Sequence, residues 1–311
     1  MGKRVVIKSL NISTNKGTVK TPCSSVELTG SGIKGDAHAG PWHRQVSMLG
    51  VESIEKQEKE LNRKIDFGEF AENITTEGFL LHQAHPLDRF VSGSTVMEVT
   101  QIGKKCNGKN CNIFKEIGSC IMPKEGIFCR VITGGELKVG SYMDYIPKTF
   151  RLKVITLSDR AFAGIYQDRS GKIIMEEMEN WFSRNHLKFN SDKKILPDDR
   201  NALSEELAKT FNEHYDIVIT TGSTGLGSRD IAPEIVTQYL DREIPGIMEH
   251  IRVKYGMVNP NALLSRSVAG LHEKTIIYTL PGSTKAINEY MDEILKSLWH
   301  IIMMSNDIDS H

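Results

Sequence analysis

The residues best suited to chemistry in this chain lie between positions 220 and 230, where the sequence reads TTGSTGLGSRD. Three glycines and several hydroxyl side chains separate a predicted buried strand at 216–219 from a predicted helix start at 232–236. Glycine permits positive φ and close backbone approach, and a helix start offers free N–H groups. The spacing therefore predicts an anion cradle. Asp230 adds a carboxylate at its end, and phosphate beside carboxylate indicates a divalent metal between them.

Polar residues also follow three other predicted strands of the second half. They are Ser158-Asp159-Arg160, Pro197-Asp198-Asp199 and Pro281-Gly282-Ser283. In a doubly wound sheet the carboxyl ends of parallel strands open onto one crevice, so we expect the four ends to share a site. Two simpler interpretations stay open. Asp198 would be a solvated turn residue or a helix cap, and Asp230 would be the N-cap of the helix that follows it.

Four thiols form the most reactive group of the first half. Cys106, Cys111, Cys120 and Cys129 have the spacing C-x4-C-x8-C-x8-C, which lacks the two tight pairs of a typical zinc site. Cys129 lies in a strand-like run, where a buried, inert thiol is expected. Cys106 follows Lys104 and Lys105, and nearby positive charge favours the thiolate that a nucleophile or sulfur carrier needs.

Other polar residues of the first half admit two interpretations each. His38 is either a metal ligand or forms a structural pair with Asp36 at a glycine-rich turn. His43 and Arg44 contact an anionic phosphate or lie on a solvated rim, and Trp42 is expected to pack.

The elements that position these residues differ between the two halves. After about residue 151, strands are predicted at 152–157, 194–196, 216–221 and 274–279, and helices at 171–185, 201–214, 232–239, 246–255 and 284–304. This alternation indicates an α/β fold, with a parallel-rich sheet flanked by helices. We therefore predict an α/β domain over residues 151–306.

Residues 1–147 predict a mostly-β domain instead. Short strands are expected at 5–10, 25–28, 45–49, 95–99 and 127–131, with one helix at 51–61. Many short strands separated by glycine-rich turns favour a barrel or a sandwich. A linker is expected at 146–150, so the chain should fold as two domains.

The composition excludes several classes of protein. The chain has 311 residues with 39 basic and 39 acidic side chains, and this balance argues against a general nucleic-acid binder. No apolar run approaches ~18 residues and the N-terminus is not signal-like, so we expect neither a membrane span nor secretion. Five cysteines, an odd number, favour a reducing compartment, and we expect a cytoplasmic protein.

The second half resembles the molybdopterin adenylyltransferase family (MogA/MoaB-like) from about residue 151 to 304. The matching motifs are SDR at 158–160, TTGSTG at 220–225, RD at 229–230, PE at 233–234, DREIPG at 241–246, LSRS at 264–267 and LPGS at 280–283. One position departs from the pattern. The family's usual second loop glycine is Ser223 here, and a side chain disfavours glycine-only conformations.

The resemblance implies a reaction in which molybdopterin and Mg²⁺-ATP give adenylyl-molybdopterin and pyrophosphate. Asp198 and Asp230 would be catalytic and would hold Mg²⁺. The match assigns substrate and cofactor binding to Ser158, Asp159, Thr221, Gly222, Ser223, Thr224, Gly225, Arg229, Ser265, Pro281, Gly282 and Ser283. Two alternatives stay open, because Arg229 would equally form an ion pair with a carboxylate and Asp159 would equally cap a helix.

The first half resembles a MOSC domain over residues 4–146. The matching segments are GIKGDAHAG at 32–40, RQVS at 44–47, TQIGKKC at 100–106 and GGELKVG at 134–140. The resemblance implies a β-barrel that binds or carries a sulfurated molybdenum cofactor, with Cys106 as a catalytic persulfide carrier or metal ligand. Cys111 or Cys120 would be the working thiol if Cys106 is not.

Both resemblances concern the same cofactor, so we expect a bifunctional protein of molybdenum-cofactor biosynthesis. It would bind molybdopterin and ATP, act with other cofactor-biosynthesis proteins or molybdoenzymes, and bind neither nucleic acid nor membrane. The family resemblance also implies a homo-oligomer, a trimer through the C-terminal domain. The alternative is a non-catalytic scaffold that binds molybdopterin and delivers cofactor. A third hypothesis is a zinc-stabilised redox module in the first half.

Overall fold

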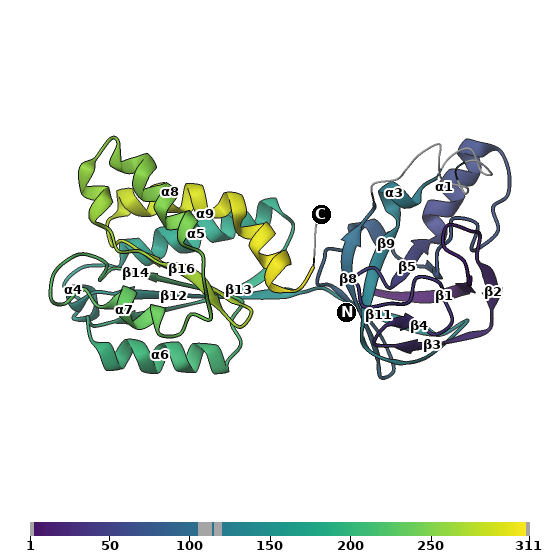
Figure 1. Ribbon diagram of the computed structural model, residues 1–311, viewed down its shortest axis with the longest axis horizontal. Coiled ribbons are helices and arrows are strands. Elements are labelled where there is room, and N and C mark those ends of the chain that lie inside the picture. Colours follow the sequence, from purple (N-terminus) through teal and green to yellow (C-terminus); the bar gives the residue numbers. More distant parts are fainter. Residues whose placement is uncertain (1–2, 105–113, 115–119, 309–311) are drawn as a thin grey trace. The chain divides into compact units, whose positions relative to one another are not determined.

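The computed structural model describes residues 3–104, 114 and 120–308 (Figure 1). The chain divides into two compact units, residues 1–148 and 149–311. Strand β11 of the first unit ends at Ile146 and strand β12 of the second begins at Thr149. The connection is therefore two residues, where we expected five. Among the described helices, none combines the length and apolar content needed to cross a bilayer.

The first unit is built mainly of strands. Its helical segments are α1 (Val51–Leu61), η1 (Leu81–Gln83) and α3 (Met122–Glu125). Its strands are β1 (Lys3–Ile12), β2 (Thr21–Cys23), β3 (Ser25–Thr29), β4 (Gly32–Ile33), β5 (Val46–Gly50), β6 (Ile74–Glu77), β7 (Arg89–Ser92), β8 (Thr95–Ile102), β9 (Ile127–Thr133), β10 (Gly135–Lys138) and β11 (Tyr142–Ile146).

Seven of these strands close into a barrel, as predicted. The order is β11-β7-β8-β9-β5-β6-β1, and β1 pairs back with β11 with Lys3 opposite Tyr145. Strand β2 pairs antiparallel with the end of β1. Strands β10, β3 and β4 form a small separate sheet. Closure removes the free edges of the main sheet, which an open sheet would have to protect.

Alternating side chains fill the barrel. Strand β11 buries Met143 and Tyr145 and exposes Tyr142, Asp144 and Ile146, which is the period-two pattern of a strand with one face in solvent. Tyr145 packs against Phe79 and Phe90 at ring-centroid distances of 4.5 and 5.4 Å. Helix α1 covers one side of the unit, where Ile54 joins a second apolar cluster with Phe70.

The second unit is a layered α/β fold. Its strands are β12 (Thr149–Leu157), β13 (Lys188–Leu196), β14 (Ile217–Thr221), β15 (Arg242–Glu243), β16 (Ala269–His272) and β17 (Thr275–Leu280). Its helical segments are α4 (Asp159–Phe162), α5 (Arg169–Arg184), α6 (Arg200–Asn212), α7 (Ala232–Thr237), α8 (Pro245–Gly256), η3 (Pro260–Leu264) and α9 (Thr284–Ser305).

The six strands form one mixed sheet in the order β13-β12-β14-β17-β16-β15. The first four strands pair in parallel, and β16 pairs antiparallel with both β17 and β15, so the predicted parallel-rich sheet is confirmed. Strands β14 and β17 are buried along their whole length, because helices cover both faces. Figure 1 shows α5, α8 and α9 on one face of this sheet and α6 and α7 on the other.

Candidate functional site

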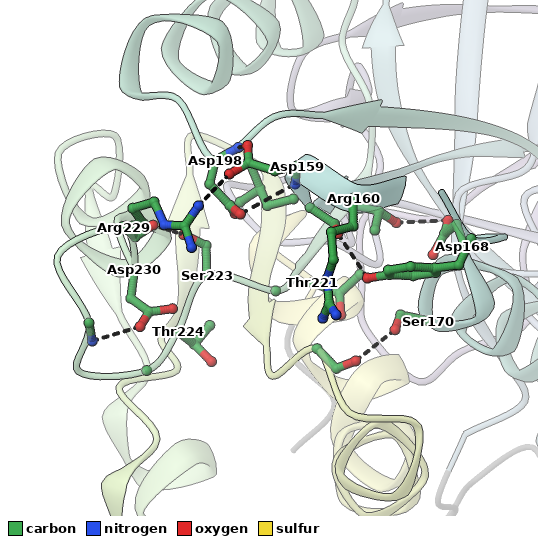
Figure 2. Close-up of a pocket in the computed structure, with 18 of the residues that line it drawn as sticks. Asp159, Arg160, Asp168, Ser170, Asp198, Thr221, Ser223, Thr224, Arg229 and Asp230 are labelled. Atoms are coloured by element: carbon green, nitrogen blue, oxygen red, sulfur yellow. Dashed lines mark hydrogen bonds and ion pairs between the residues drawn. The ribbon is translucent and has the colours of Figure 1, made fainter. Parts of the chain in front are cut away.

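The carboxyl ends of the four parallel strands surround one pocket of about 680 Å³ (Figure 2). This confirms that the predicted strand ends meet. The lining residues are Thr156, Leu157, Ser158, Asp159, Arg160, Tyr166, Asp168, Ser170, Asp198, Thr221, Gly222, Ser223, Thr224, Gly225, Gly227, Ser228, Arg229, Asp230 and Gly282.

Two carboxylates of the pocket bind each other's backbone. The N–H of Asp198 donates to Asp159 Oδ1 at 3.0 Å, and the N–H of Asp159 donates to Asp198 Oδ2 at 3.4 Å. Arg229 Nη1 lies 2.9 Å from the other Asp159 oxygen, so Arg229 forms the ion pair considered above. The ends of β12 and β13 are thereby tied together at the pocket wall.

The Asp198 carboxyl has a pKa above its usual value. Burial is the main cause, and the negative charges of Asp159 and Asp230 add to it against the opposing Asp159 N–H and Arg229 charge. The cap interpretation of Asp198 is wrong, because Asp199 is the residue that caps α6. Asp198 is instead a partly buried carboxylate that a bound cation would stabilise.

Asp230 is held by the glycine loop. Its Oδ2 accepts the N–H of Gly227 at 2.7 Å, and a Cβ added to Gly225 would lie only 2.8 Å from the same oxygen. The interpretation of Asp230 as an N-cap is wrong, since Ile231 occupies that position and no side chain caps α7. A side chain at position 225 would therefore displace the Asp230 carboxylate from the place that it occupies here.

The loop has two successive residues with positive φ. Gly222 has a φ of +94°, and a Cβ there would lie 2.3 Å from the carbonyl oxygen of Leu157. Ser223 has a φ of +56°, a region that costs a non-glycine residue about 1 kcal/mol or more. Its hydroxyl donates to the Arg229 carbonyl at 2.8 Å and accepts the Ile231 N–H at 2.9 Å. These bonds offset the strain, so serine replaces the family's glycine without loss of the conformation.

We expected the start of α7 to supply the N–H donors of the anion cradle, and it does not. The first N–H groups near α7 are not free, because those of Ile231 and Ala232 donate to the hydroxyl and carbonyl of Ser223. The loop itself supplies donors instead. The N–H groups of Ser223, Thr224 and Gly225 have no acceptor within the part of the chain that the structure describes. Consecutive free N–H groups lining a pocket are suited to an anion.

Other predicted residues have structural contacts. Ser158 caps α4, and Thr221 donates to the Pro281 carbonyl at 2.8 Å. Ser283 caps α9, and Ser265 contacts Ser267 and the Tyr290 hydroxyl. Of the nucleotide-side residues, Gly282 lines the pocket, whereas Ser265, Pro281 and Ser283 do not.

The sequence reasoning missed several lining residues between β12 and α5. Asp168 caps α5 through Gly171 and accepts the Thr156 hydroxyl at 2.9 Å, with Lys193 at 3.3 Å. An Asp three residues before a glycine at a helix start is a recognisable capping signal. Tyr166 also lines the pocket, and nothing in its spacing predicts it. Arg160 lines it too, at the strand end where it was expected, although we had given it no role of its own.

The donor set fits Mg²⁺ only together with phosphate oxygens. Within the described residues, no three His, Cys, Asp or Glu side chains gather closely enough to form a metal site of their own. Mg²⁺ in nucleotide enzymes commonly takes one or two carboxylates and completes its shell with phosphates and water. Asp198 and Asp230, whose charges repel each other in one pocket, match that requirement.

The barrel unit has a separate cavity of about 240 Å³. Arg44 and Lys104 line it, and their charged groups lie 5.1 Å from the Trp42 ring and 5.6 Å from the Phe128 ring. The Arg44 Nε is buried and has no acceptor among residues 3–104, 114 and 120–308. Trp42 is 37% exposed at this cavity, and its ring packs against the His38 ring at 6.4 Å and the Arg44 guanidinium, as expected.

Asp36 and His38 form a structural pair, with no metal needed to explain them. The Asp36 carboxylate and the Lys20 ammonium form an ion pair at 2.5 Å with both side chains fully buried. Asp36 also accepts the His38 N–H and an Asn73 amide. Burial raises the pKa of Asp36 less than the His38 and Lys20 bonds lower it, so the carboxyl is strongly acidic.

The structure describes two of the four clustered thiols, Cys120 and Cys129. Cys106 and Cys111 lie outside the described residues, so the assignment of the working thiol stays a prediction. Cys129 is fully buried and burial raises the pKa of its thiol well above the usual value, which confirms an inert role. Cys120 is partly buried beside the α1 cluster.

Comparison with known proteins assigns each unit. The family described as probable molybdopterin binding domain matches residues 153–300, and the MOSC domain family matches residues 35–144. The molybdopterin adenylyltransferase of Helicobacter pylori (strain J99) is 36% identical over 152 residues, covering 49% of this chain and 85% of that protein.

Two further relatives are similar over the same unit. The molybdopterin adenylyltransferase of Escherichia coli (strain K12) is 30% identical over 157 residues, covering 50% of this chain and 78% of that protein. A solved structure of MogA is 30% identical, covers 50% of this chain and 99% of that chain, and has a TM-score of 0.46. The chain thus belongs to the molybdopterin adenylyltransferase family, and it carries a MOSC domain ahead of the unit that places it there.

Proposed function

We propose that the α/β unit transfers the adenylyl group of ATP to molybdopterin. The terminal phosphate oxygen of the pterin forms a bond to the α-phosphorus of ATP, and the bond from that phosphorus to the β-phosphate oxygen breaks, releasing pyrophosphate. Such a transfer needs alignment and neutralisation of charge more than covalent help. The observation that carries the proposal is a single pocket that holds four carboxylates and three unpaired backbone N–H groups.

Asp198 and Asp230 are the proposed Mg²⁺ ligands. Mg²⁺ would neutralise the nucleotide phosphates and hold them in line for attack. Asp159 supports Asp198 through the paired backbone bonds, and Arg229 limits the negative charge around both. These separate roles account for the ion pair between Arg229 and Asp159 at the pocket wall.

The loop 222–225 is the proposed phosphate cradle for the pterin. Its free N–H groups donate to a phosphate without any side-chain charge. Ser265, Pro281, Gly282 and Ser283 stay assigned to the nucleotide side. Of these four residues, Gly282 lines the pocket, where its carbonyl accepts the Ser170 hydroxyl at 2.8 Å, and this position supports its assignment.

Asp230→Asn tests the proposed reaction. The amide cannot supply the anionic oxygen that Mg²⁺ requires, so we expect pyrophosphate release from ATP, Mg²⁺ and molybdopterin to fall about 1,000-fold or more. Circular dichroism should show an unchanged fold. Asp292→Asn, a neutralisation on the exposed face of α9, is the matched control and should keep full activity. Full turnover in Asp230→Asn would remove the metal role.

Equilibrium binding separates this enzyme from a non-catalytic scaffold. A scaffold should bind molybdopterin and ignore MgATP, because it has no use for a nucleotide. We expect the protein to bind both. The two carboxylates support catalysis, since a purely phosphate-binding pocket would be weakened by them.

For the barrel unit we propose binding or sulfuration of the cofactor. Its cavity presents Arg44, Lys104 and a polar wall that includes Ser47 and Asn73, which is suited to an anionic ligand. Lys104 lies two residues before Cys106 in the sequence, and the sulfur-carrying role of Cys106 stays a prediction. Delivery to molybdoenzymes or to other biosynthetic proteins, and a cytoplasmic location, are part of the same proposal.

A homo-oligomer formed through the α/β unit is also proposed. Large apolar side chains are exposed on α8 and the segment after it, with Met257 at 85%, Val258 at 82% and Val253 at 60%. Leu263 and Leu264 of η3 are more than half exposed as well. Exposed apolar groups that gather on one element are typical of a contact between proteins.

A further inference from the structure

Two arginines line the pocket, and they have different partners. Arg229 is paired with Asp159. Arg160 forms no ion pair with any residue that the structure describes, and its guanidinium lies 5.3 Å from the centre of the Tyr166 ring. The Tyr166 and Ser158 hydroxyls lie 2.9 Å apart, which holds this ring beside the arginine. The pocket therefore contains a positioned cation that lacks a counter-ion.

Arg160 also lies apart from the acidic cluster. The charges with the largest effects on the pKa of the Asp198 carboxyl are those of Asp159, Arg229 and Asp230. Figure 2 shows Arg160 extending away from Asp198 and Asp230, toward the side where Ser170 lies. One pocket thus has an acidic end, where a metal and its nucleotide would bind, and an end with Arg160, where the carboxylate of Asp168 is paired with Lys193 at 3.3 Å.

We propose that Arg160 binds the terminal phosphate of molybdopterin and that Tyr166 positions its guanidinium. This inference rests on the proposed function. The N–H groups of loop 222–225 would donate to this phosphate but carry no net charge, so a cation beside them strengthens binding, and a planar guanidinium can bind two phosphate oxygens at once. The nucleotide does not need Arg160, because the carboxylates bind it through a cation. Stacking on the Tyr166 ring limits the rotamers of Arg160 while leaving its N–H groups available.

The test measures binding of each substrate separately, without turnover, under anaerobic conditions. In Arg160→Ala we expect the Kd for molybdopterin to rise about 10- to 100-fold, the usual cost of removing a charged donor to an anion. The Kd for MgATP should change less than about 2-fold. Arg169→Ala is the matched control, since Arg169 is an exposed arginine at the start of α5 that does not line the pocket. It should leave both constants unchanged.

A phosphatase-treated pterin identifies the group that Arg160 contacts. Wild-type protein should bind molybdopterin more tightly than its dephosphorylated form, and Arg160→Ala should lose most of this difference. Arg160→Lys should recover part of it, since the charge returns without the planar fork. If Arg160→Ala weakens both pterins equally, or weakens MgATP instead, the assignment is overturned.

Tyr166 separates positioning from direct contact. Tyr166→Phe keeps the ring and removes the hydroxyl, so the Kd for molybdopterin should change little. Tyr166→Ala removes the ring and should reproduce part of the Arg160→Ala effect. If Tyr166→Ala raised the Kd for molybdopterin by the same factor in Arg160→Ala protein as in wild-type protein, Tyr166 would not act through Arg160.

These outcomes also distinguish the two proposals. Wild-type protein that binds both substrates but makes no pyrophosphate would contradict adenylylation and leave the Arg160 assignment standing. Active protein in which Arg160→Ala alters neither constant would contradict the assignment and leave adenylylation standing. Wild-type protein that does not bind molybdopterin would overturn both.

Discussion

The pocket of the α/β unit and the cavity of the barrel unit differ in the charged side chains that they offer to an anionic ligand. The pocket is formed by loops at four strand ends and gathers carboxylates that need a cation from outside. The barrel cavity is lined mostly by residues of connecting segments and brings its own cations, Arg44 and Lys104, against aromatic rings. The metal-nucleotide site proposed for the pocket and the single-anion site proposed for the cavity thus call for different residues.

The ion pairs of the two units differ in the same way. Lys20 and Asp36 are fully buried in the barrel, whereas Arg229 and Asp159 are 79% and 44% exposed in the pocket. An exposed pair adds little to stability, but removal of one partner of a buried pair leaves an uncompensated charge. The barrel pair should therefore act on folding, and the pocket pair on chemistry.

Lys20→Met tests the larger of these effects. It leaves the Asp36 carboxylate buried without its counter-ion, and we expect the free energy of unfolding of the barrel unit to fall by about 3 kcal/mol. Chemical unfolding monitored by fluorescence measures the change. Adenylylation per folded molecule should be unaltered. Lys34→Met, which removes an exposed pair with Glu27, is the control and should cost little. Equal stability of the two variants would contradict the comparison.

Ser223 variants test a smaller effect in the α/β unit. Ser223→Ala keeps the cost of positive φ and loses both hydroxyl bonds, so unfolding of this unit should need about 1–2 kcal/mol less. Ser223→Gly loses the same bonds but removes the strain, so it should be more stable than Ser223→Ala by roughly 1 kcal/mol. Thermal unfolding of the two variants measures the order. The reverse order would show that the hydroxyl does not offset backbone strain.

The acidic limb of the activity profile tests the pocket charges, with the smallest expected change. Asp198 must be ionised to bind Mg²⁺, so kcat/KM should rise with pH through its raised pKa. Asp159→Asn removes a negative neighbour, lowers that pKa and should move the limb to lower pH. Arg229→Gln removes a positive neighbour and should move it to higher pH. Shifts in the same direction would mean that another group controls the limb.

The sequence was most informative where local pattern and tertiary role agree. The bounds of helix α6 and strand β14 lie within two residues of the predicted bounds. Both could be predicted because apolar residues follow one another in a buried strand but recur every three to four residues in a helix. Strands β6 and β7 were missed. The sequence of β6 is ITTE, and its buried Thr75 and Thr76 hide the inward face from a hydrophobicity pattern.

The site was predictable as a location and less so as a set of contacts. The meeting of strand ends follows from the topology of a parallel sheet, so Asp159, Asp198 and Asp230 were expected together. The capture of the Ile231 N–H by Ser223 depends on a side-chain rotamer in a strained loop. The buried Lys20–Asp36 pair likewise depends on tertiary packing, and no spacing rule predicts a buried lysine.

The two ends of the α/β sheet bear on how copies of this chain can associate. Strand β13 lies at one end and carries charged residues such as Asp192, Lys193 and Lys194, while β15 at the other end has only two residues. Charged or very short outer strands resist the addition of a strand from another molecule. Growth into β-linked aggregates is therefore disfavoured, and any specific assembly should form between helix surfaces.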